Sequence, residues 1–469
     1  MQMVVVLGFV LVMVLEGVGS PLAPVGKGWV VISMVLGYVI GGYLFTKIIV
    51  LSVSRKMRRT GSHRGIGKAC AILMIAVHVY LLAGIAGVMF AGWSDLVGER
   101  LHLAAIPLVK EMVLVSPFVL AVFLHWLAVY PLDRTVRNYV HEVSIIAGEP
   151  ALPVWNRWKF LLFHIRYSLL FAAVPIGLIV LITDLMHLVE PALGSIPTMS
   201  MTVLGVGAVA LFTPTILVYL WRARFLPDGA LRRRLERMSR RVGFSFREIV
   251  VWDSAGVIVN AAVVGFIRHA RYVLISDAML EHFSDDAVAA VFAHEAGHAV
   301  HHHIPYTAIF SIGWFLLTVP LLQGLSAAMG ASETAAEIAG ASASAVLWVG
   351  IFGLLSRRFE RQADLFAASI MSREFSPEPD GWEDQCPYRL NREGVRIFSA
   401  ALQAVARLNG IEPSQRNFRH GSIRSRLEYL EEVLRTGSHS SADRNVRRIK
   451  AIIWVLFILG VIVTVFSVV

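Results

Sequence analysis

Charged residues and cysteines are both scarce in this chain. Asp, Glu, Lys and Arg make up 16% of its 469 residues, against about 25% in an ordinary soluble domain. With 56% hydrophobic residues, this low charge excludes an intrinsically disordered chain. The two cysteines, Cys70 at the start of an apolar run and Cys386 in a polar loop, do not suggest a disulfide partnership, so a disulfide scaffold is excluded as well.

The hydrophobic residues are concentrated in long runs separated by short basic stretches, as in a multi-pass membrane protein. A helix needs roughly 17 to 25 apolar residues to cross the bilayer core. One shorter run, Met1–Leu15, lacks the Lys or Arg that opens a secretory signal, which favours a retained membrane helix over a cleaved signal peptide. The eight runs of sufficient length are Trp29–Val53, Ala69–Gly92, Met112–Tyr130, Tyr167–Thr183, Met201–Trp221, Pro305–Met329, Ala339–Leu355 and Ala451–Val469.

The loops between these runs differ in their positive charge. An excess of Lys and Arg marks the cytoplasmic side of a membrane protein. The loop after Val53 and the segment after Trp221 are rich in arginine, whereas residues 184–200 contain no Lys or Arg. One topology fits every loop and places two polar segments, 222–304 and 356–450, in the cytoplasm. The basic loops fit a prokaryotic inner membrane, with phospholipid and not nucleic acid as the partner of the net charge of +10.

We therefore expect a polytopic α-helical membrane protein of about nine spans with a cytoplasmic α+β domain. Strands are predicted from runs of β-branched residues, and Ser284 is a predicted N-cap for a helix from Asp285 to about His302. The predicted strands are Glu248–Trp252, Val257–Gly265 and Arg271–Ser276. The predicted regions are 1–221 (about six spans), 222–304 (first part of the cytoplasmic domain), 305–355 (a transmembrane hairpin interrupting it), 356–450 (second part) and 451–469 (a last membrane helix).

The helix after Ser284 contains the pattern HExxH, from His294 to His298. Residues four apart lie on one face of a helix, about 5–6 Å apart at Cβ, so both imidazoles can bind one zinc ion. Glu295 lies beside them and could accept a proton from a water molecule on the metal, then pass it to a leaving amine. The pattern predicts metal-dependent hydrolysis.

A catalytic zinc normally has three protein ligands and one open position. Glu360, just after Leu355, is the best third candidate, because the hairpin folds back to bring it near His298. Its alternative interpretation is a solvated acid next to the membrane. Asp364, one turn later, could accept the free ring N–H of a ligand histidine. Three further histidines are expected to lie near lipid headgroups and not on the metal: His301, three residues past His298, and His302 and His303, which rotate away from the metal.

This set of residues resembles the integral-membrane gluzincin peptidases, the family that includes the CAAX prenyl protease type I and the heat-shock protease HtpX. The resemblance covers roughly residues 230–430 and is carried by residues 271–303, the ExxxD block in 356–364 and the stretch 420–426. It implies a zincin-like fold and one zinc ion per chain. The metal ligands would be His294, His298 and Glu360, with Glu295 as general base.

The resemblance also implies roles for residues outside the HExxH pattern. Asn260 and Ala261 match an Asn-Ala strand beside the substrate cleft, where a peptide could be held as an added strand; a bulge residue is the alternative for Asn260. His420 and Arg426 match a late histidine and arginine that could stabilise an oxyanion, with a headgroup-binding loop as the alternative. Gly421 stands where the family usually has proline, which leaves the local backbone open.

The sequence thus predicts a zinc metalloendopeptidase with a cytoplasmic active site that hydrolyses membrane-associated or misfolded membrane proteins. Lipidated substrates follow from the resemblance alone, and the sequence indicates no oligomeric state. One alternative is a non-catalytic zinc-binding scaffold or chaperone, which would not need Glu295. Another is a transporter with a zinc-regulated domain, but the sequence shows neither the charges paired within spans nor the internal repeats typical of transporters.

Overall fold

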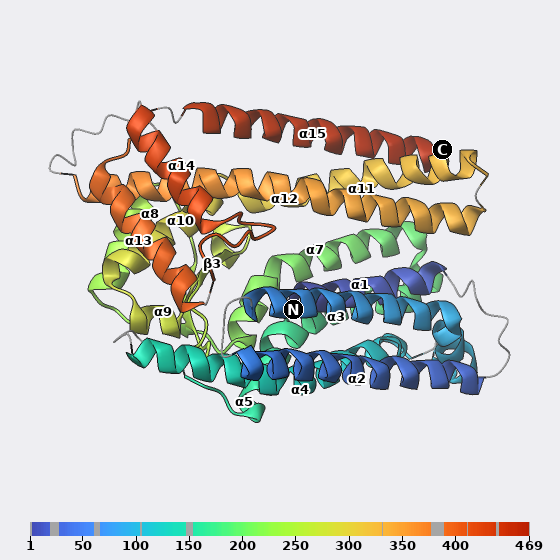
Figure 1. The fold of residues 1–469 in the computed structure, drawn as a ribbon. Coiled ribbons are helices and arrows are strands. Elements are labelled where there is room, and N and C mark those ends of the chain that lie inside the picture. Colours follow the sequence, from blue (N-terminus) through green and yellow to red (C-terminus); the bar gives the residue numbers. More distant parts are fainter. Residues whose placement is uncertain are drawn as a thin grey trace. The chain divides into compact units, whose positions relative to one another are not determined.

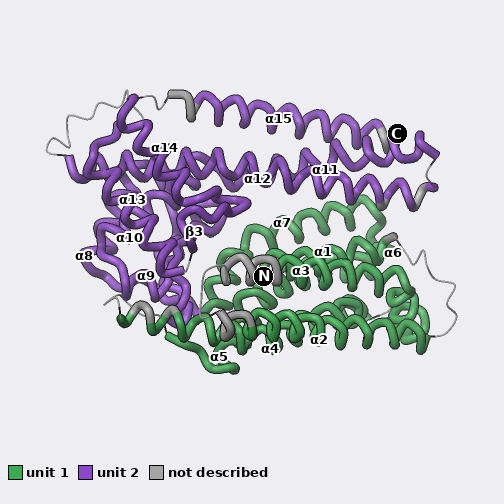
Figure 2. The backbone as a smooth tube through the Cα atoms, in the orientation of Figure 1, with its two compact units in different colours: residues 1–221 green, residues 222–469 purple. Residues whose placement is uncertain are grey.

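The computed structural model describes residues 2–18, 28–60, 66–103, 106–146, 153–330, 332–376, 389–409, 411–437 and 440–468. The chain folds into two compact units, residues 1–221 and residues 222–469 (Figure 2). The boundary between the units coincides with the predicted end of the amino-terminal membrane region. Cys386 lies outside the described residues, so the expectation about the two cysteines is not addressed by the structure.

The first unit is built from helices. Short π-helical turns follow α3, at Met89–Trp93 and Leu96–Arg100, and another, Ile165–Leu169, joins α5 to α6. The first helix packs against α3, α4 and α6. The helices are α1 (Gln2–Val18), α2 (Gly28–Thr60), α3 (Ile66–Val88), α4 (Val109–Ile146), α5 (Arg157–His164), α6 (Leu170–Leu193) and α7 (Ser195–Leu220).

The second unit combines a small sheet with helices. Its strands are β1 (Arg224–Phe225), β2 (Glu248–Trp252), β3 (Ala261–Val264) and β4 (Tyr272–Ser276). Its helices are α8 (Ala230–Arg241), a 3₁₀ turn at Arg268–Ala270, α9 (Asp277–His282), α10 (Asp285–Val300), α11 (His303–Ala328), α12 (Glu333–Glu374), α13 (Arg392–Leu408), α14 (Ile423–Thr436) and α15 (Ser440–Val468). The long helices α11, α12 and α15 pack side by side (Figure 1).

Eight helices of the described chain are long and apolar enough to span a membrane, and Gln2–Gly17 is a shorter apolar helix. They occur in the order of the predicted runs. Large apolar side chains on these helices are exposed, including Trp29 (63%) and Leu188 (60%). Helices that expose apolar residues in this way are suited to lipid and not to water. The prediction of a polytopic α-helical membrane protein is therefore confirmed.

The sheet has the strand order β1-β2-β4-β3, with β2 parallel to β4 and the other two pairs antiparallel. In the described sheet β3 is consequently an edge strand. It is shorter than the predicted run from Val257 to Gly265, because the preceding residues are held in a turn. The Asp277 carboxylate accepts hydrogen bonds from the backbone N–H groups of Ser254 and Gly256, both at 3.0 Å.

The helix that carries HExxH begins as predicted but ends earlier. The Ser284 hydroxyl caps its start by accepting a hydrogen bond from the Ala287 N–H at 3.3 Å. The helix ends at Val300, and His302 adopts a left-handed conformation with φ of 57°. This turn separates α10 from α11, so His303 begins a new helix and does not extend the HExxH helix.

The predicted boundary between membrane hairpin and cytoplasmic domain at Leu355 is not a structural break. A single helix, α12, continues from Glu333 to Glu374. Its carboxyl-terminal half enters the core of the second unit, where Leu365 and Met371 are fully buried with Phe292 of α10 and Phe398 of α13. The helix that leaves the apolar hairpin therefore carries Glu360 into the domain without an intervening loop.

Candidate metal centre

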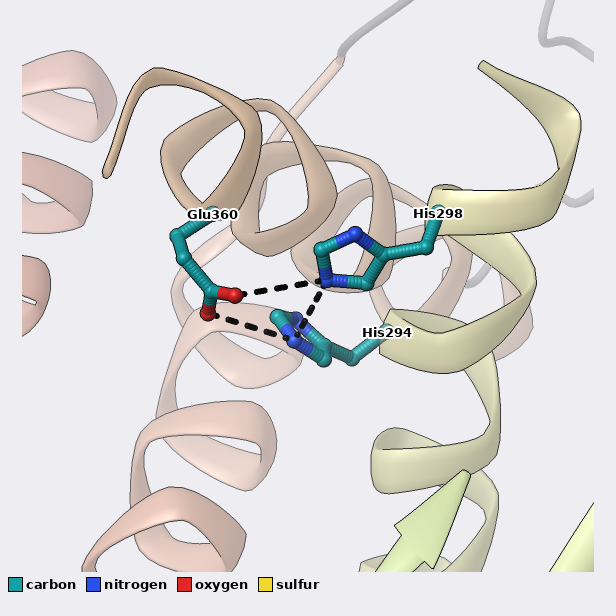
Figure 3. A group of neighbouring side chains, drawn as sticks. All are labelled: His294, His298 and Glu360. Carbon is teal, nitrogen blue, oxygen red and sulfur yellow. Dashed lines mark hydrogen bonds and ion pairs between the residues drawn. The ribbon is translucent and has the colours of Figure 1, made fainter. Parts of the chain in front are cut away.

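Helices α10 and α12 bring the three predicted metal ligands together (Figure 3). The Nε2 atoms of His294 and His298 lie 3.2 Å apart, and they lie 3.7 and 3.6 Å from carboxylate oxygens of Glu360. Ligand atoms about 2.1 Å from a tetrahedral zinc ion are separated by ~3.4 Å. The three side chains therefore already have the spacing that such an ion requires.

The chemistry of these donors also fits a divalent cation. Glu360 is only 3% exposed, and its Oε2 atom accepts no hydrogen bond from the described residues, although Arg426 Nη1 lies 3.3 Å from it. A buried carboxylate is costly in free energy unless positive charge and hydrogen bonds compensate it, and a divalent cation would add such compensation. Two imidazoles and one carboxylate form a typical zinc ligand set with an open fourth position, so these residues fit the metal that the sequence predicts.

A glycine within HExxH allows α12 to approach this closely. A Cβ atom placed on Gly297 would lie 3.2 Å from the Ala363 Cα atom and 3.3 Å from the Phe366 Cβ atom. These distances are shorter than ordinary van der Waals contacts between carbon atoms. The absence of a side chain at position 297 thus brings the two backbones together and places Glu360, one turn before Ala363, opposite the two histidines.

His294 is supported by a buried acid on the same helix as Glu360. Its Nδ1 atom lies 3.1 Å from the Oδ1 atom of Asp364, the acid that the sequence predicts to orient a ligand histidine. Asp364 in turn accepts two hydrogen bonds from Arg426, from Nε at 2.8 Å and from Nη2 at 2.5 Å. The carboxylate that lies next to the His294 ring is thus itself held in place by two hydrogen bonds.

Arg426, which is predicted to stabilise an oxyanion, lies among the acids of this site. Its side chain is buried, two of its nitrogens bind Asp364, and the third, Nη1, lies 3.3 Å from the Glu360 Oε2 atom. All three guanidinium nitrogens therefore face carboxylates. In this arrangement Arg426 holds the acids of the metal centre in position.

Burial and charge set the pKa values of the two ligand histidines in opposite directions. Burial is the main cause that lowers the pKa of His298 to about 3. Burial would also lower the pKa of His294, but the nearby Asp364 carboxylate outweighs it and raises that pKa. His298 is therefore neutral at physiological pH, which is the form in which an imidazole binds a metal.

His303 is a supporting residue that no pattern in the sequence indicates. Its side chain is 2% exposed; its Nδ1 atom lies 2.9 Å from His298 Nδ1, and its Nε2 atom lies 2.9 Å from the Gln362 Oε1 atom. The predicted headgroup location is wrong for His303, because the left-handed turn at His302 changes the direction in which its side chain points. By contrast, His302 is exposed.

Glu295 lies beside the metal ligands and next to the edge strand. Its Oε2 atom accepts a hydrogen bond from the backbone N–H of Val263, in β3, at 3.3 Å. Burial, with a contribution from the negative charge of Glu360, raises its pKa above that of an ordinary glutamate. A carboxylate with a raised pKa is a stronger base, as a group that accepts a proton from water must be.

A cavity of about 480 Å³ adjoins the predicted metal and catalytic residues. Its polar lining includes Asn260, the sequence-predicted substrate residue, whereas Ala261 is buried in β3 and does not line it. Much of the remaining lining is apolar. Its polar site residues are His294, Glu295, Glu360, His420 and Arg426, and its apolar residues include Ile258, Val291, Phe398, Leu402 and Val405.

His420 enters this site from the connection between α13 and α14. Its Nδ1 atom lies 2.8 Å from Glu360 Oε1, and its side chain is 43% exposed. The backbones of Asn417 and Gly421 exchange two hydrogen bonds, at 2.8 and 2.9 Å, around this residue. Gly421 has φ of 73°, a value that proline cannot adopt. The departure from the usual proline therefore suits the tight turn that presents His420.

Comparison with known proteins confirms the resemblance inferred from the sequence. Residues 226–379 match the model of Peptidase family M48. The CAAX prenyl protease 1 homolog of Oryza sativa subsp. japonica is 25% identical over 162 residues, 31% of this chain and 37% of that protein. Protease HtpX of Pseudomonas fluorescens is 27% identical over 186 residues, 39% of this chain and 57% of that protein. In both, less than two thirds of the relative's length is matched.

A solved structure extends the comparison to most of the chain. The crystal structure of S. mikatae Ste24p aligns with a TM-score of 0.51 over 85% of this chain and 98% of that chain, at 16% sequence identity. At this identity the match shows a shared fold. The family match ends at residue 379, so His420 and Arg426 are placed at the site by the structure and not by that match.

Proposed function

We propose that this chain, whose residues 226–379 match peptidase family M48, is a membrane-embedded zinc-dependent metalloendopeptidase. The observation that carries the proposal is the convergence of His294, His298 and Glu360 within 4.8 Å of one another beside a cavity that Glu295 also lines. A structural metal site would need neither an adjacent carboxylate that is not a ligand nor a cavity large enough for a peptide segment.

The residues of the chain have distinct roles in this proposal. One zinc ion per chain would lower the pKa of a water molecule and polarise the peptide carbonyl. Glu295 takes the proton from that water and delivers it to the leaving amine, as general base and then general acid. His420, partly exposed on the cavity wall, donates a hydrogen bond to the negative charge that develops on the carbonyl oxygen. Arg426 and Asp364 position the ligands.

The edge strand β3 offers a place for an extended peptide. The Ser276 N–H donates to the Asn260 carbonyl at 3.0 Å, so in this antiparallel pair the N–H groups of Ala261 and Val263 point away from β4. The Val263 N–H accordingly meets Glu295. A peptide added as a further strand would therefore run directly past the proposed base.

The apolar side of the cavity supports a substrate with a hydrophobic side chain near the scissile bond. Phe398, Leu402 and Val405 lie on successive turns of one face of α13, and Val291 of α10 also lines the cavity. An uncompensated charge against such a surface would lose its hydration. We therefore infer that peptides with aliphatic or aromatic residues next to the cleaved bond are preferred over those with charged residues.

The cellular setting is part of the proposal. The excess of arginine in residues 222–241 supports a cytoplasmic active site, and the basic loops support a prokaryotic inner membrane. Membrane-associated or misfolded membrane proteins would then reach the cavity from the membrane surface. Lipidated proteins are a second class of substrate, supported by the names of the CAAX prenyl protease relatives.

Zinc content and proteolysis, measured on the purified chain in detergent, test this proposal. The wild type should contain about one zinc per chain and should cleave an unfolded protein; Glu295→Gln should keep the zinc and lose cleavage by at least ~100-fold. Glu281→Gln, an exposed position on α9, is the matched control and should behave as wild type. Zinc without cleavage of either an unfolded protein or a prenylated peptide would support the scaffold alternative, and absence of zinc would refute the metal site.

A further inference from the structure

We propose that His303 is a positioning residue that fixes the metal ligand His298 through a three-residue chain of hydrogen bonds, His298–His303–Gln362, which we call the His303 relay. The proposal rests on the metal centre of the proposed function and names a support that HExxH and Glu360 do not include. It assigns a role to the first residue of α11, the helix that opens the membrane hairpin.

The relay is buried and continuous. His303 is 2% exposed and Gln362 is 4% exposed, and both links of the relay measure 2.9 Å between heavy atoms. The imidazole of His303 also stacks on the ring of Phe359, with centroids 4.3 Å apart and planes inclined by 5°. His303 is therefore held on its two ring nitrogens and on one ring face, which leaves it little freedom to rotate.

The hydrogen-bond directions follow from the metal and are consistent along the relay. If His298 binds the metal through Nε2, its Nδ1 carries the proton and donates it to His303. His303 Nδ1 must then be the acceptor, so the proton of the neutral ring lies on Nε2. That N–H points at the Gln362 side-chain oxygen, which can only accept. Each ring nitrogen and the amide oxygen in the relay thus has a single role, either as donor or as acceptor.

The two metal histidines consequently have different supports. His294 lies against the charged Asp364, whereas His298 is held by neutral groups only. A second carboxylate behind His298 would add negative charge to a site that already contains Glu360 and Asp364, and would reduce the effective charge of the metal. A neutral relay fixes the tautomer and the ring orientation of His298 without that loss.

The relay also joins three helices at the metal centre. His298 lies on α10, His303 is the first residue of α11, and Gln362 lies on α12, two residues after the ligand Glu360. The left-handed turn at His302 is what allows the α11 side chain to fold back onto α10. The position of His298 therefore depends on the position of the first residue of α11, where the hairpin begins.

Zinc affinity of the purified full-length chain, measured by competition with a chelator, tests the relay independently of proteolysis. His303→Phe keeps the ring that stacks on Phe359 but removes both hydrogen bonds; it should weaken zinc binding by about 10- to 100-fold. His303→Asn, whose side-chain oxygen can replace Nδ1 as acceptor, should recover most of that loss. The control His302→Asn, at an exposed position whose left-handed backbone asparagine tolerates, should bind zinc as wild type.

Gln362→Leu provides a second test if His303→Phe does not fold. It should weaken zinc binding less than His303→Phe does, and the double variant should be no worse than His303→Phe alone, because both changes break one chain of interactions. Cobalt-loaded variants should show a changed visible spectrum only when the relay is broken. Wild-type affinity in folded His303→Phe, or additive losses in the double variant, would overturn the relay. Failure of the wild type itself to bind zinc would instead refute the proposed metal centre.

Discussion

Arg426 and Asp364 form a two-pronged ion pair in the interior of the second unit, although 62 positions separate them in the chain. The two hydrogen bonds measure 2.8 and 2.5 Å, the Asp364 side chain is fully buried and that of Arg426 is 7% exposed. The pair joins the start of α14 to the α12 turn that follows Glu360. It thereby links the segment that carries His420 to the helix that carries Glu360, a proposed metal ligand.

Removal of one partner of this pair should be more damaging than removal of both. Asp364→Leu leaves a buried guanidinium beside Glu360 alone, and Arg426→Leu leaves two buried carboxylates together; each should cost about 3–5 kcal/mol of unfolding free energy. The double variant should recover part of that loss, because the uncompensated charge disappears. Denaturant titration of the three variants in detergent measures the coupling. Losses that simply add would contradict a shared ion pair.

The raised pKa of Glu295 predicts how stability of the metal-free protein depends on pH. A carboxyl group whose pKa is higher in the folded state favours folding while it is protonated, and that contribution is lost as pH rises through the folded-state pKa. Glu295→Gln cannot ionise, so with chelator present its melting temperature should exceed that of wild type at pH 8 and approach it near pH 5.

Zinc and a second glutamine variant control this pH measurement. Saturating zinc should reduce the difference in melting temperature between Glu295→Gln and wild type, because the positive charge of the metal offsets the negative charge of the ionised carboxylate. Glu281→Gln, on the exposed surface of α9, should follow wild type at every pH. A Glu295→Gln protein that is less stable than wild type from pH 5 to pH 8 would show that the surroundings do not disfavour the ionised form of Glu295.

Local sequence patterns predicted the parts of the site that lie on one helix. The spacing of His294 and His298 placed both on one face, and Ser284 marked the helix start that the structure shows. Glu360 could be predicted because the apolar hairpin between it and His298 had to fold back. Each of these inferences depends on periodicity, capping or membrane span length, which are all local properties of the chain.

Contacts between residues that are far apart in the sequence could not be predicted from such local patterns. The prediction for His303 was wrong because the HExxH helix was extended through His302 as one continuous helix. No local sequence signal predicted the left-handed conformation of His302. Arg426 is engaged by acids of another helix, so its side chain could not be assigned from its spacing to His420. Asn409 binds the backbone of Val259, 150 residues away. Such contacts depend on tertiary packing, which periodicity does not specify.

Gly297 provides a test of how closely the two helices of the proposed metal site, α10 and α12, must approach each other. Gly297→Ala would place a Cβ atom 3.2 Å from the Ala363 Cα atom, and relief of this contact should push α12 and Glu360 away from the histidines. We expect a loss of about 1–3 kcal/mol in stability and weaker zinc binding. Gly350→Ala, also on α12 but with nothing within 4 Å of the added atom, should change neither. Full zinc affinity in Gly297→Ala would contradict the requirement for close approach.

Asn409 should affect substrate binding more than metal binding. Its amide bridges the backbone of Val259, donating to the carbonyl at 2.8 Å and accepting from the N–H at 3.3 Å, and so fixes the chain just before Asn260 and the β3 edge. Asn409→Asp keeps the acceptor but loses the donor. If the edge strand holds the peptide, this variant should raise KM several-fold, with kcat and zinc content close to wild type. A fall in kcat at unchanged KM would instead indicate that the β3 edge acts through Glu295, whose carboxylate binds the Val263 N–H.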